Sequence, residues 1–178
     1  IVFGDWSSDV CSSDLVHGIA ENVLESTPGF NAKMSDLHAA VGLASLEKFA
    51  IALACRQSYG ERLRAFIDVH CADVFTNQCI PDGVESNFQN LGVRFAVRPN
   101  LDIESVAREF RRGGIETRRY FWPPLHYLPA YRGVTGLPHT ERLGASLLCL
   151  PLHSFMDEAM LCLVERACRQ TAERMRLS

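Results

Sequence analysis

Residues 29–43, GFNAKMSDLHAAVGL, form a short polar loop that leads directly into a helical pattern, and the rest of the chain is organised around them. Asn31 and Lys33 are the strong hydrogen-bond donors of the loop, and Ser35 and Asp36 are residue types that favour a helix start. A helix N-terminus beside an amide and an ammonium group is a place where a phosphate can bind. On local chemistry alone, a plain helix start that binds nothing is the commoner outcome, so the anion site is a hypothesis.

Apolar residues continue from this loop at three- and four-residue spacings as far as Leu63 and Phe66, which predicts a long helix over residues 35–70. Gly42 lies within it and costs about 1 kcal/mol relative to alanine in a helix interior. We therefore expect close packing at Gly42, against another domain or a second subunit. A helix of this length exceeds what one compact domain can bury, so we interpret it as a helix that spans two domains.

The remaining chain alternates between short strand and helix patterns. The segment 71–89 is predicted to be a loop. Strands are predicted over 93–97, 115–121 and 147–150, and helices over 102–113, 138–143 and from 154 onward. This order predicts the α+β class, with a short sheet packed by helices.

Capping residues support two of these helices. Asp102 is predicted to cap the helix that ends at Gly113 and Gly114. The segment 154–157, SFMD, resembles a capping box that starts the last helix, with aspartate in place of glutamate. The face predicted to be buried in that helix comprises Met156, Met160, Leu163, Val164 and Ala167.

Composition places the chain among ordinary soluble proteins. It has 178 residues, 22% of them charged, and a net charge of −3, so we expect no nucleic-acid partner. No uninterrupted apolar run approaches the roughly 20 residues of a membrane span, and no export signal is recognisable, so we expect no membrane partner and a cytoplasmic location. Residues 1–15 contain the repeated triplet Ser-Ser-Asp and no structural period, and our hypothesis is that this segment is not native.

The seven cysteines favour free thiols. Their number is odd and no pair has the C-x-x-C spacing, so we expect buried, reduced side chains in a reducing compartment. A metal site at His70, Cys71 and Cys79 matches no zinc spacing, and we expect no metal.

A second concentration of functional side chains is residues 118–127, RRYFWPPLHY, followed by Tyr131. Two arginines, aromatic rings and a histidine at a strand end are able to hold an anionic substrate and to move protons, which makes Arg118, Tyr120 and His126 candidates. The alternative is an aromatic-proline plug that closes the core and leaves the arginines in solvent. Of the remaining histidines, His38 and His153 are expected to be structural or exposed, and His139 lies in a segment predicted to be a plain helix start.

Four segments, in order, resemble one family. Residues 29–47, GFNAKMSDLHAAVGLASLE, look like the G-x-N-x-[RK]-M signature of the DegT/StrS-type sugar aminotransferases, which depend on pyridoxal phosphate, and VHGI at 16–19 resembles the segment that precedes it there. GIETRRYFWPPLH at 114–126 with PAY at 129–131, LPHTERL at 137–143 and LCLPL at 148–152 resemble three further segments. The resemblance covers nearly everything from Val16 onward.

The resemblance implies a fold-type I transferase that carries pyridoxal phosphate and shares each active site between the two subunits of a homodimer. Asn31 would reach the cofactor phosphate of the partner subunit, and Lys33 would assist it. Arg118, Tyr120, His126 and Tyr131 would lie on the side of a nucleotide-linked keto-sugar, which receives its amino group from glutamate. Residues 16–34 would end the large domain, residues 35–70 would form the helix that spans the two domains, and residues 71–178 would form the small C-terminal domain.

The lysine that the family's chemistry requires is not found in the matching segments. The family's Schiff-base lysine lies in an S-x-H-x-x-K segment upstream of the H-G-I stretch, and the only lysines here, Lys33 and Lys48, are in other contexts. We therefore expect a C-terminal portion of an aminotransferase that is inactive alone. Two alternatives stay open: a sugar dehydratase of the same family, with histidine at the lysine position, and a non-enzymatic α+β interaction domain.

Overall fold

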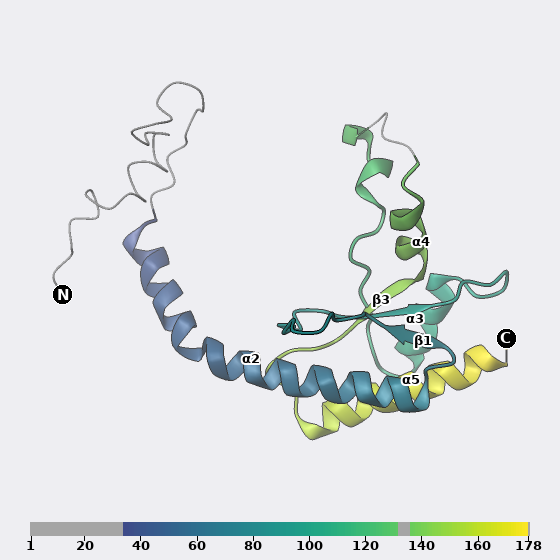
Figure 1. Ribbon diagram of the computed structural model, residues 1–178, viewed down its shortest axis with the longest axis horizontal. Coiled ribbons are helices and arrows are strands. Elements are labelled where there is room, and N and C mark those ends of the chain that lie inside the picture. Colours follow the sequence, from purple (N-terminus) through teal and green to yellow (C-terminus); the bar gives the residue numbers. More distant parts are fainter. Residues whose placement is uncertain (1–33, 132–135, 178) are drawn as a thin grey trace. The chain divides into compact units, whose positions relative to one another are not determined.

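The computed structural model describes residues 34–131 and 136–177 (Figure 1). The chain divides into two compact units, residues 1–49 and 50–178, and each is considered by itself. Asn31 and Lys33 lie outside the described residues, as do residues 1–15. The elements in chain order are α2 (Asp36–His70), β1 (Phe75–Asn77), β2 (Leu91–Phe95), α3 (Ile103–Arg112), the 3-10 turns η1 (Leu125–Tyr127) and η2 (Pro129–Tyr131), α4 (Pro138–Ser146), β3 (Leu147–Leu150) and α5 (Glu158–Arg176).

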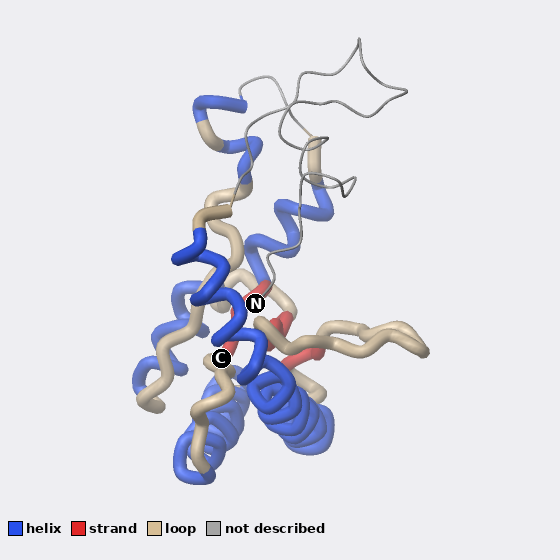
Figure 2. The backbone as a smooth tube through the Cα atoms, turned by 90° about the vertical axis from the view of Figure 1, so that its left-hand side faces the viewer, coloured by secondary structure: helices blue, strands red, loops and turns tan. Residues whose placement is uncertain are grey.

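The second unit contains a small antiparallel sheet in the order β1-β2-β3. Phe75 pairs with Phe95 at one side of β2, and Leu91 pairs with Leu150 at the other. Figure 2 shows these short strands as a small patch among the helices. The predicted α+β class, with a short sheet and a long helix, is confirmed.

Two strand predictions are wrong in detail. Residues 75–77 form β1 although they were expected to be loop. Three residues are too few to show an alternating pattern, so the sequence did not reveal this strand. The strand expected over 115–121 is reduced to a single bridge between Arg118 and Cys149. Pro123 and Pro124, which have no N–H group, follow soon after and cannot extend the ladder.

The core of the second unit lies where α3, α5 and the later part of α2 pack with the sheet. Its members are the buried apolar residues Leu63, Ile67, Phe75, Val93, Phe95, Val106, Phe110, Leu148, Leu150, Leu161, Val164 and their neighbours. Val97, the last residue of the strand predicted over 93–97, is 53% exposed, since the strand ends at Phe95.

The caps of α3 follow the prediction and those of α5 do not. The Asp102 carboxylate accepts a hydrogen bond from the Ser105 amide at 2.8 Å, and Gly114 follows the helix with φ of +84°, a conformation that favours glycine. In α5 the cap is Asp157, which accepts from the Met160 amide at 2.8 Å, so Ser154 is not a capping residue. The predicted buried face is largely confirmed, since Met156, Val164 and Ala167 are buried and Leu163 is partly buried. Met160, also predicted to be buried, is 45% exposed.

The first part of α2 carries an exposed apolar surface. Leu37, Val41, Leu43, Leu46 and Phe49 are each at least half exposed, and no atom lies within 4 Å of a Cβ placed on Gly42. The close neighbour expected at Gly42 is therefore not among the described residues. By length and composition alone α2 is also apolar enough to cross a membrane, in contrast to the sequence expectation. Core helices of soluble proteins share this length and composition.

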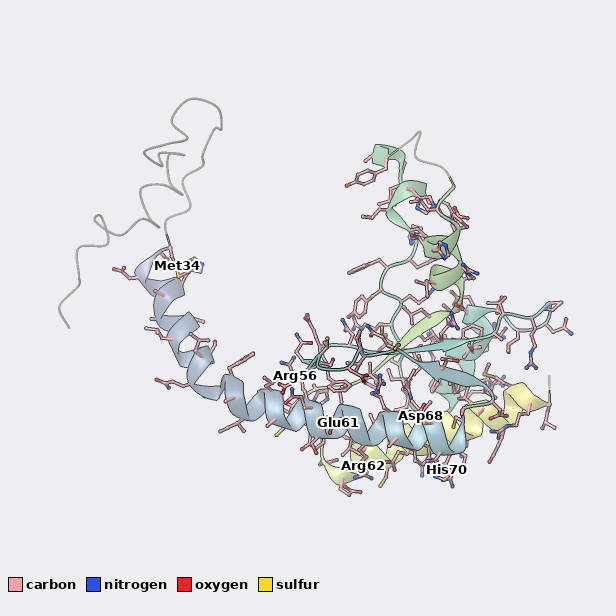
Figure 3. All side chains as sticks on the ribbon, viewed as in Figure 1. Met34, Arg56, Glu61, Arg62, Asp68 and His70 are labelled. Atoms are coloured by element: carbon pink, nitrogen blue, oxygen red, sulfur yellow. The ribbon has the colours of Figure 1, made fainter. Side chains whose placement is uncertain are left out.

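The later part of α2 is joined to α5 by an ion-pair cluster. Arg62 donates to both oxygens of Glu158, at 2.6 and 2.8 Å, and its Nε donates to Glu165 at 2.8 Å. Figure 3 shows Arg62 on the side of α2 that faces α5. The hydrogen bonds from Arg62 hold the pKa of Glu158 below its usual range, and those from Arg176 do the same for Asp73.

This cluster predicts that the protein loses stability in acid. A carboxyl whose pKa is lower in the folded state contributes stability that is complete above its unfolded pKa and is lost as the pH falls through its folded pKa. The melting temperature should therefore fall as the pH is lowered below about 4. Arg62→Gln should lower it by about 2–4 °C at pH 7 and flatten the fall in acid, as followed by circular dichroism. Arg94→Gln is the control, because Arg94 is an exposed arginine outside the cluster. A full acid dependence in Arg62→Gln would contradict the assignment.

Candidate functional site

A cavity of about 230 Å³ opens where β3 ends and β2 begins. The register of β2 and β3 brings residues 89–90 beside 150–153, and the bridge from Arg118 to Cys149 adds residues 116–120. The polar part of its lining consists of Gln89, Asn90, Glu116, Arg118, Tyr120 and His153. The structure thus brings two of the four predicted substrate residues, Arg118 and Tyr120, to one cavity.

Arg118 is held at the cavity by its backbone alone. Its amide donates to the Cys149 carbonyl at 2.9 Å and its carbonyl accepts from the Cys149 amide at 2.7 Å. Within the part of the chain that the structure describes, its exposed guanidinium makes no hydrogen bond or ion pair. This side chain is therefore available to a ligand.

Cys149, at the inner side of the cavity, is unsuited to nucleophilic chemistry. Burial raises the pKa of its thiol, and a backbone hydrogen bond from Tyr120 offsets only part of that effect. The six described cysteines are free, as expected, but only Cys71, Cys149 and Cys168 are buried. No group of three or more His, Cys, Asp or Glu side chains in the described ranges is arranged to hold a metal.

Arg119, the neighbour of Arg118, is a structural residue. Its Nη1 donates to Glu104 at 2.6 Å, and its guanidinium lies 4.4 Å from the centre of the Trp122 ring. Its Nε is buried and has no hydrogen-bond partner among the described residues. The expectation of two solvated arginines is therefore wrong for Arg119.

His126 and Tyr131 lie away from the cavity, on η1 and η2. The His126 side chain is only 5% exposed, its Nε2 is 3.1 Å from the Glu141 carboxylate, and its ring packs edge-on against Tyr127. Tyr131 is half exposed. The His126 side chain therefore connects η1 to α4 and does not join Arg118 and Tyr120 at the cavity.

The aromatic segment does not plug the core. Phe121 is 77% exposed, and Trp122 packs over α4, where a Cβ on Gly144 would lie 2.9 Å from its ring. Together with residues of η1, η2 and α4 these side chains form an exposed surface, which we call the aromatic arm surface: Tyr120, Phe121, Trp122, Leu125, Tyr127, Tyr131, Leu137 and Leu143. Exposed apolar area of this extent is typical of a surface that another protein segment covers.

The described residues do not fit a pyridoxal-phosphate site. Lys48 is the one lysine among the described residues, it is exposed on α2, and it does not line the cavity at the end of β3. A cavity of about 350 Å³ between α2 and residues 80–88 contains no predicted site residue. A cofactor held through a Schiff base would need an amine that these residues do not supply.

The sequence analysis missed Gln89, Asn90 and Glu116 as cavity residues, and His153 was expected to be merely structural or exposed. A usable signal was present, since residues 114–118 and 148–152 both belong to segments of the family resemblance. An antiparallel pairing of these two segments would have brought Glu116, Arg118 and the residues after Leu150 together.

Comparison with known proteins agrees with this fold. The sequence model of the DegT/DnrJ/EryC1/StrS aminotransferase family matches residues 8–167 of this chain. This range begins inside the segment that was expected to be non-native. The chain is 24% identical over 155 residues to the dTDP-4-amino-4,6-dideoxy-D-glucose transaminase of Escherichia coli, covering 81% of this chain and 40% of that protein. It is 32% identical over 126 residues to the dTDP-4-dehydro-2,3,6-trideoxy-D-glucose 4-aminotransferase of Saccharopolyspora spinosa, covering 70% of this chain and 31% of that protein.

Solved structures show the same similarity. A DegT DnrJ EryC1 StrS aminotransferase from Brucella abortus superposes with a TM-score of 0.69 at 25% identity, over 88% of this chain and 41% of that one. For S. venezuelae DesV the TM-score is 0.73 at 20% identity, over 90% and 43%. The chain thus spans less than half the length of these relatives. It belongs to the DegT/DnrJ/EryC1/StrS aminotransferase family.

Proposed function

We propose that this chain is the C-terminal portion of a pyridoxal-phosphate-dependent transaminase that transfers an amino group, from glutamate, to a keto-sugar linked to a nucleotide. The family match over residues 8–167 is the observation that carries the proposal. Two relatives are named as transaminases of dTDP-linked deoxysugars, and the chain covers 40% and 31% of their lengths. The missing lysine and the poor fit of the described residues to the cofactor are consistent with a portion that lacks the cofactor-binding domain.

We also propose that the intact protein is a homodimer. The exposed apolar side chains of residues 37–49 and the aromatic arm surface support the proposal, because exposed apolar patches often mark protein interaction surfaces. The large domain and the second subunit would cover them. Asn31 would then bind the cofactor phosphate of the partner subunit, with Lys33 beside it. The free thiols support a reducing compartment such as the cytoplasm.

The proposed substrate residues fall into two groups with different tasks. Arg118 and Tyr120 line the cavity and would bind a charged part of the substrate directly. His126 is buried against Glu141, and its task would be to hold η1 and α4, and thus Tyr131, in place.

The test compares the intact protein with this chain. With pyridoxal phosphate, glutamate and a dTDP-linked keto-deoxysugar, the intact protein should form amino-sugar and 2-oxoglutarate, and the 178-residue chain should form neither. Asn31→Ala in the intact protein should weaken cofactor binding by about tenfold, the size expected for one hydrogen bond to a charged group. A dehydrated sugar as the product, or a borohydride-reducible cofactor adduct at one specific lysine of the chain alone, would contradict the proposal.

A further inference from the structure

The cavity at the end of β3 has the chemistry of an anion site. Its polar side chains are rich in hydrogen-bond donors: a guanidinium from Arg118, amides from Gln89 and Asn90, a phenol from Tyr120 and an imidazole from His153. Glu116 is the only carboxylate among its lining residues. The donors therefore outnumber the acceptors.

Arg118 differs from the paired arginines of this protein. Arg62, Arg119 and Arg176 each bind a carboxylate at 2.6–2.8 Å. Arg118 binds none within the described ranges, although Glu116 lines the same cavity. A guanidinium presents a fork of N–H groups that matches the oxygens of a carboxylate or a phosphate.

His153 is arranged as a second donor. Its Nδ1 accepts a hydrogen bond from the Phe155 amide at 3.2 Å. With Nδ1 as the acceptor, the proton of the neutral ring is on Nε2, which is then a donor. This assignment follows from the amide donor, which requires an acceptor nitrogen.

The size of the cavity limits the ligand. About 230 Å³ is below the range of roughly 300–1,000 Å³ that is usual for sites that enclose a whole small molecule. The cavity therefore suits one charged group of a larger substrate. Leu150, Pro151 and Leu152 supply the apolar part of the lining.

We infer that this cavity binds an oxyanion group of a substrate through Arg118, His153 and Asn90. The Glu116 carboxylate in the same lining restricts which anions bind. The group is either a carboxylate of a dicarboxylate amino donor or the diphosphate of a sugar nucleotide. The choice of these two ligands rests on the proposed function, whereas the anion site itself rests on the cavity. Glu116 would disfavour ligands that carry excess negative charge at its side of the cavity.

The experiment is a titration of the 178-residue chain, without cofactor, followed by 1H–15N correlation spectra. Pyrophosphate and glutarate are the two probes, with chloride at matched ionic strength as the reference. Amide shifts should be confined to residues 89–90, 116–120 and 149–153. Arg118→Gln should weaken binding by about tenfold or more, because it removes a charge-assisted contact. Glu116→Gln should strengthen it by about two- to fivefold, because it removes a like charge.

Matched variants separate the site from general charge effects. Arg94→Gln removes the same charge from an exposed position of β2 outside the cavity and should leave binding unchanged. Asn90→Ala weakens binding without any change in net charge. A preference for pyrophosphate would assign the site to the sugar nucleotide, and a preference for glutarate to the amino donor.

Dispersed shifts, equal loss in Arg94→Gln and Arg118→Gln, or weaker binding in Glu116→Gln would overturn the inference. Because no cofactor or turnover is involved, this result is independent of the transaminase assay. If the probes do not bind but the intact protein is an active transaminase, only the anion site is refuted. If the probes bind but the intact protein shows no transaminase activity, only the proposed reaction is refuted.

Discussion

Phe110→Ala should lower the free energy of unfolding by about 3–5 kcal/mol, the largest effect expected for any single substitution considered for this protein. Phe110 lies on α3, its side chain is fully buried, and its ring centre is 5.7 Å from that of Phe75 on β1. Truncation would remove the contact between α3 and the sheet and leave a cavity that the close-packed surroundings fill only in part. Urea unfolding followed by circular dichroism measures the change.

The control is Phe121→Ala. Phe121 is also a phenylalanine in the same unit, but it is 77% exposed, so its truncation should change the free energy of unfolding by less than about 0.5 kcal/mol. If Phe110→Ala leaves too little folded protein to measure, Phe110→Leu should still show a loss of about 1 kcal/mol. Equal losses at Phe110 and Phe121 would contradict the burial pattern described here.

The helices of this fold were largely predictable from the sequence, because their evidence is local. The spacing of Val106 and Phe110 and the cap at Asp102 identify α3 within one short window. The strands were less predictable. β1 is only three residues long, and the pairing of Arg118 depends on Cys149, which lies far along the chain. Periodicity cannot report a pairing partner, so the sequence suggested a regular strand where one bridge forms.

The candidate site was predictable in part for the same reason. Arg118 and Tyr120 were identified from their own residue types and from the family resemblance. Asn90, Glu116 and His153 reach the same cavity only through the register of β2 and β3 and the bridge at Arg118. His126 differs from them: its chemistry suggested a substrate residue, and its side chain lies against Glu141 and Tyr127, outside this cavity.

Gly60→Ala should lower the free energy of unfolding by about 1–3 kcal/mol, although alanine is the better helix former. Gly60 is buried on α2, and a Cβ at this position would lie 2.5 Å from Cγ and 2.8 Å from Cε1 of Phe88. Phe88 cannot move away easily, because its backbone has φ of +44°, its amide donates to Ser86 Oγ at 3.1 Å, and its side chain is buried. Removal of the overlap requires a shift of the 86–88 segment or of the helix.

Gly42→Ala is the matched test, because it makes the same change in the same helix with the opposite surroundings. No atom lies within 4 Å of a Cβ at Gly42, so only the helix propensity remains, and the substitution should stabilise the helix by about 0.5–1 kcal/mol. Urea unfolding and helix content by circular dichroism should therefore change in opposite directions in the two variants. In the intact protein the sign at Gly42 should reverse if a domain or subunit packs against it, as the sequence predicts. A stabilising Gly42→Ala in both the chain and the intact protein would show that nothing covers this part of α2.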